Sequence, residues 1–118
     1  MINNTFAKDF IDEHIRFWNS HHLTDILSHY SDEIVLISPL AVKLVENGAV
    51  KGKKALEEYF QKGLEAYPDL KFELRHCYAG VNSICMLCYS SIADREVAEV
   101  LHMDENNKIW KVEAHYQI

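Results

Sequence analysis

Apolar side chains near the start of the chain recur with the period of a helix. Over residues 4–20 they are spaced so that they share one face: Ala7, Phe10, Ile11, Phe17 and Trp18. Asn4 or Thr5 can cap the first turn through a side-chain oxygen. The pattern therefore predicts an amphipathic helix over residues 4–20.

Two further helices are predicted by the same criterion. The shorter one spans about residues 22–30 and is ended by Ser31-Asp32; its apolar stripe consists of Leu23, Ile26, Leu27 and Tyr30. The longer one spans residues 52–67, because Pro68 cannot continue a helix and one face carries Ala55, Leu56, Tyr59, Phe60, Gly63 and Leu64.

The remaining apolar runs are typical of strands. Residues 34–37 are β-branched or apolar and precede Ser38-Pro39, which predicts a short strand buried on both sides. Residues 40–51 lack a clean period, so a small hairpin and a mobile loop both stay open. Turn residues then separate runs that predict an antiparallel meander over about 71–79, 84–92, 96–104 and 108–117.

The order of these elements indicates the fold class. Helices come first and strands after them, without strand-helix alternation, which predicts an α+β domain with helices on one face of a curved sheet. The chain has 118 residues, 48% of them apolar, and contains no internal repeat or linker. We therefore expect one domain over residues 1–118.

Charge and cysteine content indicate which partners and which cellular compartment to expect. Counting 12 Lys and Arg against 18 Asp and Glu gives a net charge of −6, which argues against nucleic acid and membrane surfaces as partners. The N-terminus lacks signal-peptide features and no apolar run could span a bilayer, so we expect a cytoplasmic protein. An odd number of cysteines predicts reduced, mostly buried thiols at Cys77, Cys85 and Cys88.

Several short segments resemble the SnoaL-like branch of the NTF2-like superfamily over about residues 6–116. They are Trp18-Asn19-Ser20-His21-His22-Leu23-Thr24-Asp25-Ile26, Tyr30-Ser31-Asp32-Glu33, Ile37-Ser38-Pro39, Gly52-Lys53-Lys54-Ala55-Leu56, Pro68-Asp69-Leu70-Lys71-Phe72 and Asp104-Glu105-Asn106-Asn107-Lys108-Ile109. The resemblance implies a cone, with three N-terminal helices in the concavity of a curved antiparallel sheet that is mixed at one edge. It also implies a pocket for a small, largely apolar molecule. The superfamily contains ketosteroid isomerases, dehydratases, polyketide cyclases and transport factors, so the resemblance leaves the reaction open.

The resemblance also assigns positions to isomerase chemistry. The isomerase's general base, an aspartate before the proline that closes the first strand, corresponds to Ser38. A serine hydroxyl cannot take a substrate proton unaided near neutral pH, so we interpret Ser38 as a strand-ending or pocket-lining residue. The two oxyanion donors correspond to His14 and Glu99, and a supporting helical tyrosine corresponds to Phe60, which has no hydroxyl.

The apolar pattern places both oxyanion positions in the interior. His14 shares the helical stripe of Phe10 and Trp18, so it is either a satisfied, half-buried histidine or a binding or acid–base group. Glu99 alternates with Val97 on one strand face, and burial in an apolar cavity would favour its neutral form. A strand register shifted by one residue would instead turn Glu99 toward solvent or a dimer partner.

The pocket wall is predicted from the same alternation. Every second residue of the last strand should face inward: Trp110, Val112, Ala114 and Tyr116. We expect Trp18, Ser38, Phe60 and Leu101 to complete the wall. Tyr116 either binds a ligand through its hydroxyl or belongs only to the core.

No metal and no nucleotide cofactor is expected. The histidines of the first two predicted helices, His14, His21, His22 and His29, lack the i, i+4 spacing of paired ligands. Cys85 and Cys88 are three residues apart, which places them on opposite faces of a strand. The chain also lacks a Gly-rich phosphate loop and a serine elbow.

Two functions remain open. One is an isomerase, dehydratase or cyclase in which Glu99 moves a proton and His14 assists. The other is a non-catalytic pocket protein or a dimeric interaction module. A two-fold dimer through the sheet is expected because Ile84, Met86 and Val100, or their alternates, would otherwise form an exposed apolar patch.

Overall fold

The computed structural model describes residues 1–118, except for the side chain of Glu46. Its helices are α1 (Asn4–Ser20), α2 (Leu23–Leu27) and α3 (Lys53–Ala66), and two 3₁₀ turns are η1 (Pro39–Ala41) and η2 (Glu46–Gly48). Its strands are β1 (Tyr30–Ile37), β2 (Ala49–Lys51), β3 (Phe72–Ala79), β4 (Ser83–Ser90), β5 (Arg95–Met103) and β6 (Ile109–Tyr116). The fold is therefore α+β, as predicted.

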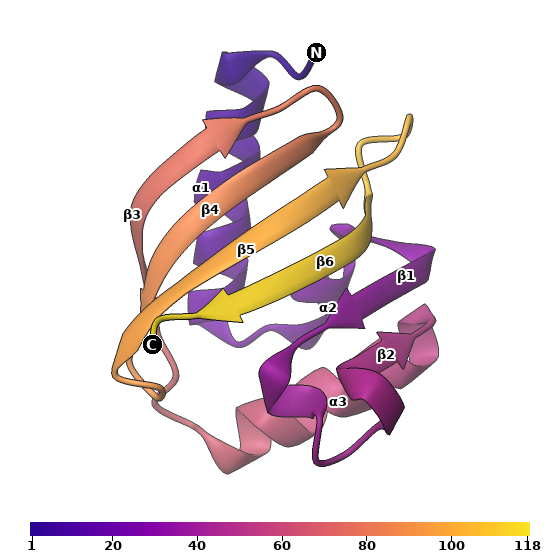
Figure 1. Ribbon diagram of the computed structural model, residues 1–118, viewed down its shortest axis with the longest axis vertical. Coiled ribbons are helices and arrows are strands. Elements are labelled where there is room, and N and C mark those ends of the chain that lie inside the picture. Colours follow the sequence, from indigo (N-terminus) through magenta and orange to yellow (C-terminus); the bar gives the residue numbers. More distant parts are fainter.

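The strands form one open, curved sheet (Figure 1). Its six strands follow the order β2-β1-β6-β5-β4-β3. β1 and β6 run parallel, while the other neighbours are antiparallel. The predicted meander forms the larger part of the sheet, and β1 with β2 extends it at the mixed end.

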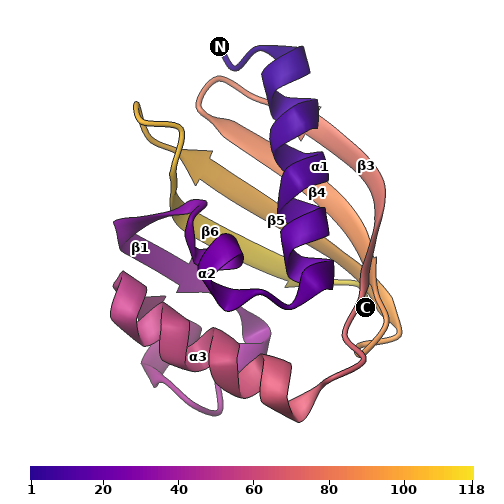
Figure 2. The same ribbon diagram turned by 180° about the vertical axis from the view of Figure 1, so that it is seen from behind.

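The three helices cover one face of this sheet, which we call the inner face (Figure 2). α1 crosses the sheet over β3 and β4, and α3 runs beside β1 and β2. Ile11 of α1, Leu56 of α3 and Leu101 of β5 have no exposed surface at all (0%). The core lies between the helices and the inner face, so any internal cavity must lie there too.

α1 matches its predicted bounds, but its cap differs by one residue. Asn3, and not Asn4 or Thr5, accepts a hydrogen bond from the Phe6 backbone N–H through Oδ1 at 3.1 Å. The buried stripe of α1 contains Phe10 and His14. The helix therefore presents an imidazole to the interior, as its periodicity predicts.

The prediction of a helix over residues 22–30 was too long, and that of the strand after it was too short. α2 ends at Leu27, where the Ser28 hydroxyl donates to the Asp25 carbonyl at 2.6 Å. β1 begins at Tyr30 and alternates buried and more exposed residues, ending with Ile37 at 36% exposure. A strand buried on both sides was therefore the wrong interpretation, because only its inner side chains enter the core.

The stretch over residues 40–51 contains η2 and β2, and only its last three residues, Ala49–Lys51, form part of the sheet. β2 pairs antiparallel with the end of β1, which resolves the open choice in favour of a hairpin-like return. Gly48 has φ +65°, and its carbonyl accepts from the Ser38 backbone N–H at 3.0 Å. The turn therefore holds Ser38, the last residue before η1, in a fixed position.

The register of β4 and β5 decides which side chains face inward. Met86 pairs with Glu99, and Ile84 with Leu101, so all of these share the inner face. Of the three residues named for an outer patch, Ile84 and Met86 are buried in the core, while Val100 lies on the outer face. Cys85 and Leu87, the alternates of Ile84 and Met86, share that face with Val100 and Ala98.

β6 contains a bulge at Trp110. His102 pairs with Lys111 and Met103 with Ile109, so β6 has one more residue than its partner at this point. Trp110 is that extra residue and lies 44% exposed on the outer side, next to the His102 ring at 5.6 Å. The regular alternation assumed for this strand therefore fails before Val112.

Candidate functional site

A cavity of about 610 Å³ opens between α3, the end of α1 and the inner face of the sheet. Its deep wall is mainly apolar and aromatic, with contributions from Trp18, Tyr30, Phe60 and Met86. Trp18 meets Phe60 edge-on at 4.6 Å between ring centroids. Such a volume and lining suit a small organic molecule.

The mouth of the cavity is formed by exposed residues. Leu40, Leu44 and Tyr67 line it and are 54%, 66% and 48% exposed. Lys62 and Arg95 also line it and are exposed. An apolar ligand with a negatively charged end would therefore meet two cations as it enters.

Glu99 is the acidic residue among the described lining residues of the cavity. It lies on β5 between Met86 of β4 and Ala114 of β6, its direct cross-strand partners. Burial raises the pKa of Glu99 from 4.5 to about 7, because a charge is costly where water is excluded. Glu99 faces the cavity, as the alternation of β5 predicts, and can exist in both protonation states near neutral pH.

Three phenol groups line the cavity within electrostatic range of Glu99. Burial raises the pKa of Tyr59, Tyr116 and Tyr30, and the neighbouring Glu99 carboxylate raises each further. For Tyr116 the pKa reaches about 12. These tyrosines therefore stay protonated at neutral pH, and each can donate a hydrogen bond from its hydroxyl.

Ser38 is buried at the end of β1 and has both predicted roles. Its hydroxyl accepts a hydrogen bond from the Leu40 backbone N–H at 3.2 Å, which caps η1. It also lines the cavity, where its side chain partly offsets the raised pKa values of Tyr59 and Tyr116. Ser38 therefore lies at two places at once: before η1, which carries the mouth residue Leu40, and on the cavity wall near Tyr59 and Tyr116.

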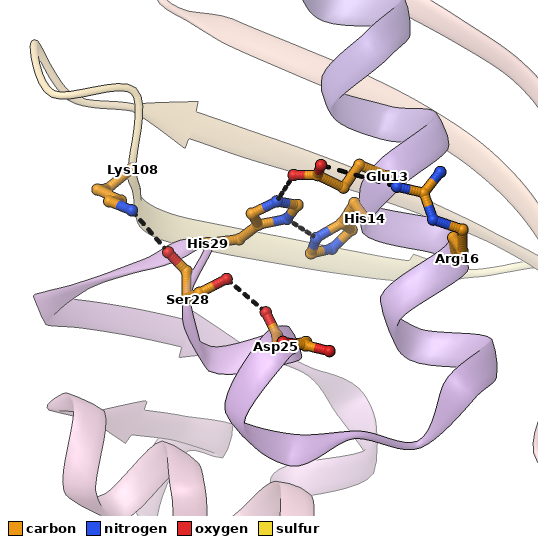
Figure 3. A network of polar contacts seen from close by, with 7 residues as sticks. All are labelled: Glu13, His14, Arg16, Asp25, Ser28, His29 and Lys108. Atoms are coloured by element: carbon orange, nitrogen blue, oxygen red, sulfur yellow. Dashed lines mark hydrogen bonds and ion pairs between the residues drawn. The ribbon is translucent and has the colours of Figure 1, made fainter.

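His14 lies outside the cavity wall, contrary to the expectation that it pairs with Glu99. Its ring is fully buried (0% exposed), and its Nδ1 lies 2.9 Å from Nδ1 of His29 (Figure 3). Burial and the nearby His29 lower the pKa of His14 from 6.5 to about 3. His14 lies outside the cavity because of its position on α1: Ile15 and Trp18 face the cavity, while His14 faces His29 at the start of β1.

Three predicted wall residues also lie elsewhere. Leu101 and Val112 are completely buried (0%) and belong to the solid core next to the cavity. Trp110 is turned outward by the bulge. Trp18, Ser38, Phe60 and Tyr116 do line the cavity.

Tyr30 and Tyr59 are site residues that the sequence pattern did not reveal as such. Both were counted among the apolar positions of helical stripes, where a tyrosine ring is ordinary core material. Tyr30 lies on β1 and Tyr59 on α3, so elements distant in sequence bring both tyrosines to the cavity wall, where the charge of Glu99 influences them. The available signal was that each carries a polar atom that needs a partner in the core.

Metal-ligating side chains do not converge among the residues that the structure describes. Within the described residues, no three histidine, cysteine, aspartate or glutamate side chains are grouped as a metal ion would require. Cys85 and Cys88 are on opposite faces of β4, as their spacing predicts. None of the helices described here is both long and apolar enough to cross a membrane.

Comparison with known proteins places this architecture in a family. The SnoaL-like domain family matches residues 11–112. A solved SnoaL-like protein of unknown function from Burkholderia thailandensis is 34% identical, with 100% of both chains covered and a TM-score of 0.94. No curated protein matches the chain.

More distant solved structures share the fold. An NTF2-like protein of unknown function from Cytophaga hutchinsonii is 12% identical, with 94% of this chain and 89% of that chain covered and a TM-score of 0.74. The epoxide hydrolase/cyclase-like enzyme SalBIII, with a role in pyran ring formation in salinomycin, is 18% identical, with coverages of 100% and 95% and a TM-score of 0.77. The family match over most of the chain, together with the relative that it covers in full, shows that this chain belongs to the SnoaL-like family.

Proposed function

We propose that this protein binds a small, largely apolar carbonyl compound in its cavity and moves a proton on it through Glu99. The observation that carries this proposal is the position of the Glu99 carboxyl group on the wall of an apolar cavity, where burial raises its pKa to about 7. A general acid–base group works best when its pKa is close to the working pH. Perturbed carboxyl groups in cavities are often functional groups.

The surroundings of Glu99 suit the making of an enolate. The Glu99 carboxylate takes a proton from the carbon next to the carbonyl, and the electron pair of that C–H bond moves to the carbonyl oxygen. A neutral phenol, from Tyr30, Tyr59 or Tyr116, donates a hydrogen bond to this oxygen as its charge grows. The acid form of Glu99 then returns the proton at another position, which isomerises the compound, or assists loss of a hydroxyl group.

His14 has no direct part in this proposal. It does not line the cavity, and its pKa of about 3 leaves it uncharged at neutral pH. The acid–base role that we first expected for the pair of His14 and Glu99 therefore falls to Glu99 with the tyrosines.

The experiment is a comparison of the parent with Glu99→Gln on a panel of small enones and β-hydroxy ketones. We expect turnover to fall by about 10²–10⁴-fold, the usual contribution of general acid–base catalysis, while the bound substrate still fits. Glu96→Gln is the matched control, because Glu96 lies on the same strand and faces outward. Equal turnover by the parent and Glu99→Gln on an accepted substrate would exclude Glu99 as the proton-transfer group.

A second candidate function is a binding module without catalysis. Ser38 stands where related isomerases carry their base, and Phe60 lacks a hydroxyl, so part of that machinery is absent. If the protein only binds its ligand, the parent and Glu99→Gln should bind it equally well, and neither should form a product. The outer face, which carries Leu87 and Val100, would then be the second functional surface as a two-fold dimer interface.

A further inference from the structure

Three side chains beside the cavity form a continuous hydrogen-bonded chain that the proposed chemistry does not use. Glu13 and His14 are neighbours on α1, and His29 is the last residue before β1. Nε2 of His29 lies 2.8 Å from Oε1 of Glu13, and Nδ1 of His29 lies 2.9 Å from Nδ1 of His14 (Figure 3). The chain runs from a partly exposed carboxylate at one end to a fully buried ring at the other.

Aromatic rings keep water away from the two imidazoles. Phe10 stacks on His29 at 4.3 Å between centroids, and Phe17 lies 5.1 Å from the same ring. Tyr30 lies 5.8 Å from His14 and also lines the cavity. The inner end of the chain is therefore next to a cavity residue.

Charged groups meet this chain at its outer end. Arg16 of α1 lies 3.7 Å from the second carboxylate oxygen of Glu13. Lys108, from the turn between β5 and β6, donates to the Ser28 carbonyl at 2.8 Å, and its charge opposes protonation of His29. On α2 the carboxylate of Asp25 is turned toward His22, 3.6 Å away.

The hydrogen-bond geometry fixes the position of each proton. A carboxylate can only accept, so Nε2 of His29 carries a proton and donates it to Glu13. Nδ1 of neutral His29 must then accept, so Nδ1 of His14 carries the proton between the rings. Nε2 of His14 is left as a bare lone pair, and it has no hydrogen-bond partner within the described part of the chain.

We propose that Glu13, His29 and His14 form a proton relay, in which one proton taken up from solvent ends at Nε2 of His14 while His14 passes its Nδ1 proton to His29. One O–H bond of a hydronium ion and the N–H bond at Nδ1 of His14 break, and one N–H bond forms at Nε2 of His14 and one at Nδ1 of His29. The added positive charge thus settles on His29, beside the Glu13 carboxylate. His14 stays neutral throughout and changes from its Nδ1–H to its Nε2–H tautomer.

The burial of the two rings favours this distribution of charge. A cationic His14 would have a full desolvation cost and no carboxylate beside it, whereas a cationic His29 contacts Glu13. Desolvation lowers the pKa of His29, and Glu13 partly offsets that effect. Uptake of one proton by the relay therefore converts Nε2 of His14, whose ring lies beside Tyr30, from an acceptor into a donor.

The test is the tautomer of each ring, measured by long-range ¹⁵N–¹H NMR on the ¹⁵N-labelled full chain during a pH titration. At pH 8 we expect His14 as the uncommon Nδ1–H tautomer and His29 as Nε2–H. On acidification, His29 should become cationic and His14 should switch to Nε2–H with the same midpoint. An Nε2–H tautomer of His14 at pH 8, or a cationic His14 at that midpoint, would overturn the relay.

Two variants test the part of Glu13 in the relay. Glu13→Gln removes the charge that stabilises cationic His29, so the shared midpoint should move to lower pH by about one unit or more. Asp12→Asn is the matched control, because Asp12 is on the same helix and pairs with Lys8 at 2.6 Å, away from both imidazoles. An unchanged midpoint in Glu13→Gln would contradict the proposal. These readouts need no substrate, so they stay decisive whether or not Glu99 proves catalytic.

Discussion

Glu99 stands directly opposite Ala114 in the ladder between β5 and β6. Both residues line the cavity, so the methyl group of Ala114 leaves free volume beside the carboxyl group. Ala114→Leu should fill that volume and compete with the ligand for space, and we expect ligand affinity to fall by about tenfold or more, which corresponds to about 1.4 kcal/mol. Titration calorimetry with a cavity ligand measures the change. Ala55→Leu, at an exposed position of α3, is the control that should bind like the parent.

Glu99→Gln should change how stability depends on pH. The folded state raises the pKa of Glu99 from 4.5 to about 7, so its stabilising contribution is complete below pH 4.5 and is lost as pH rises to 7. Gln has no such loss. Between pH 4.5 and pH 8 the variant should therefore gain about 3 kcal/mol relative to the parent, at about 1.4 kcal/mol per pKa unit. Urea unfolding at both pH values checks this, and a constant difference would contradict it.

His14→Gln should reduce sensitivity to acid. The folded state lowers the pKa of His14 from 6.5 to about 3, so its contribution is complete above pH 6.5 and is lost as pH falls toward 3. Over that range the parent should lose about 1.4 kcal/mol per pH unit more than the variant, the value for one proton. Unfolding free energies at four pH values between 7 and 4 give the two slopes. Parallel slopes would mean that His14 takes up its proton as readily when folded as when unfolded.

Gly48→Ala should destabilise the turn that holds Ser38. A β-carbon at Gly48, where φ is +65°, would approach the Ser38 carbonyl oxygen to 2.9 Å. We expect a loss of roughly 1–3 kcal/mol from this strained conformation, measured by thermal unfolding. Gly63→Ala is the control, because a β-carbon there meets no atom within 4 Å. In the interior of α3 that change should instead stabilise by about 0.5–1 kcal/mol.

The outer face of the sheet should hold two copies of the chain together. Leu87 of β4 lies on this face, opposite Ala98 of β5, and is only partly buried in a single chain. Leu87→Glu places a charge in this apolar area and should convert the dimer to a monomer in light scattering at tens of micromolar. Val81→Glu is the control, since Val81 is 67% exposed at the turn before β4. A monomeric parent at the same concentration would remove the basis for a dimer.

Long periodic segments with clear ends were predictable from the residues. The α1 pattern runs over four turns, and α3 lies between Gly52 and Pro68. The predicted helix was too long because the ring of Tyr30 continues the apolar stripe of α2. In the structure Tyr30 is buried as the first residue of β1. Burial alone does not tell a helix from a strand in so short a segment.

The candidate site was predictable only where strand alternation applied. Glu99 was placed correctly because β4, β5 and β6 pair regularly around it. The partner of His14 was missed, since His29 is 15 residues away and meets it through the packing of α1 on the start of β1. Such contacts depend on how elements pack, and no local pattern within α1 contains that information.

At the bulge in β6, Trp110 has no partner residue in the pairing of β6 with β5. Were Trp110 absent, Ile109, Lys111 and Val112 would still alternate inward, outward and inward against β5. We therefore expect a chain shortened by one residue here to keep the pairing of β6 with β5, and with it the cavity on the inner face of the sheet.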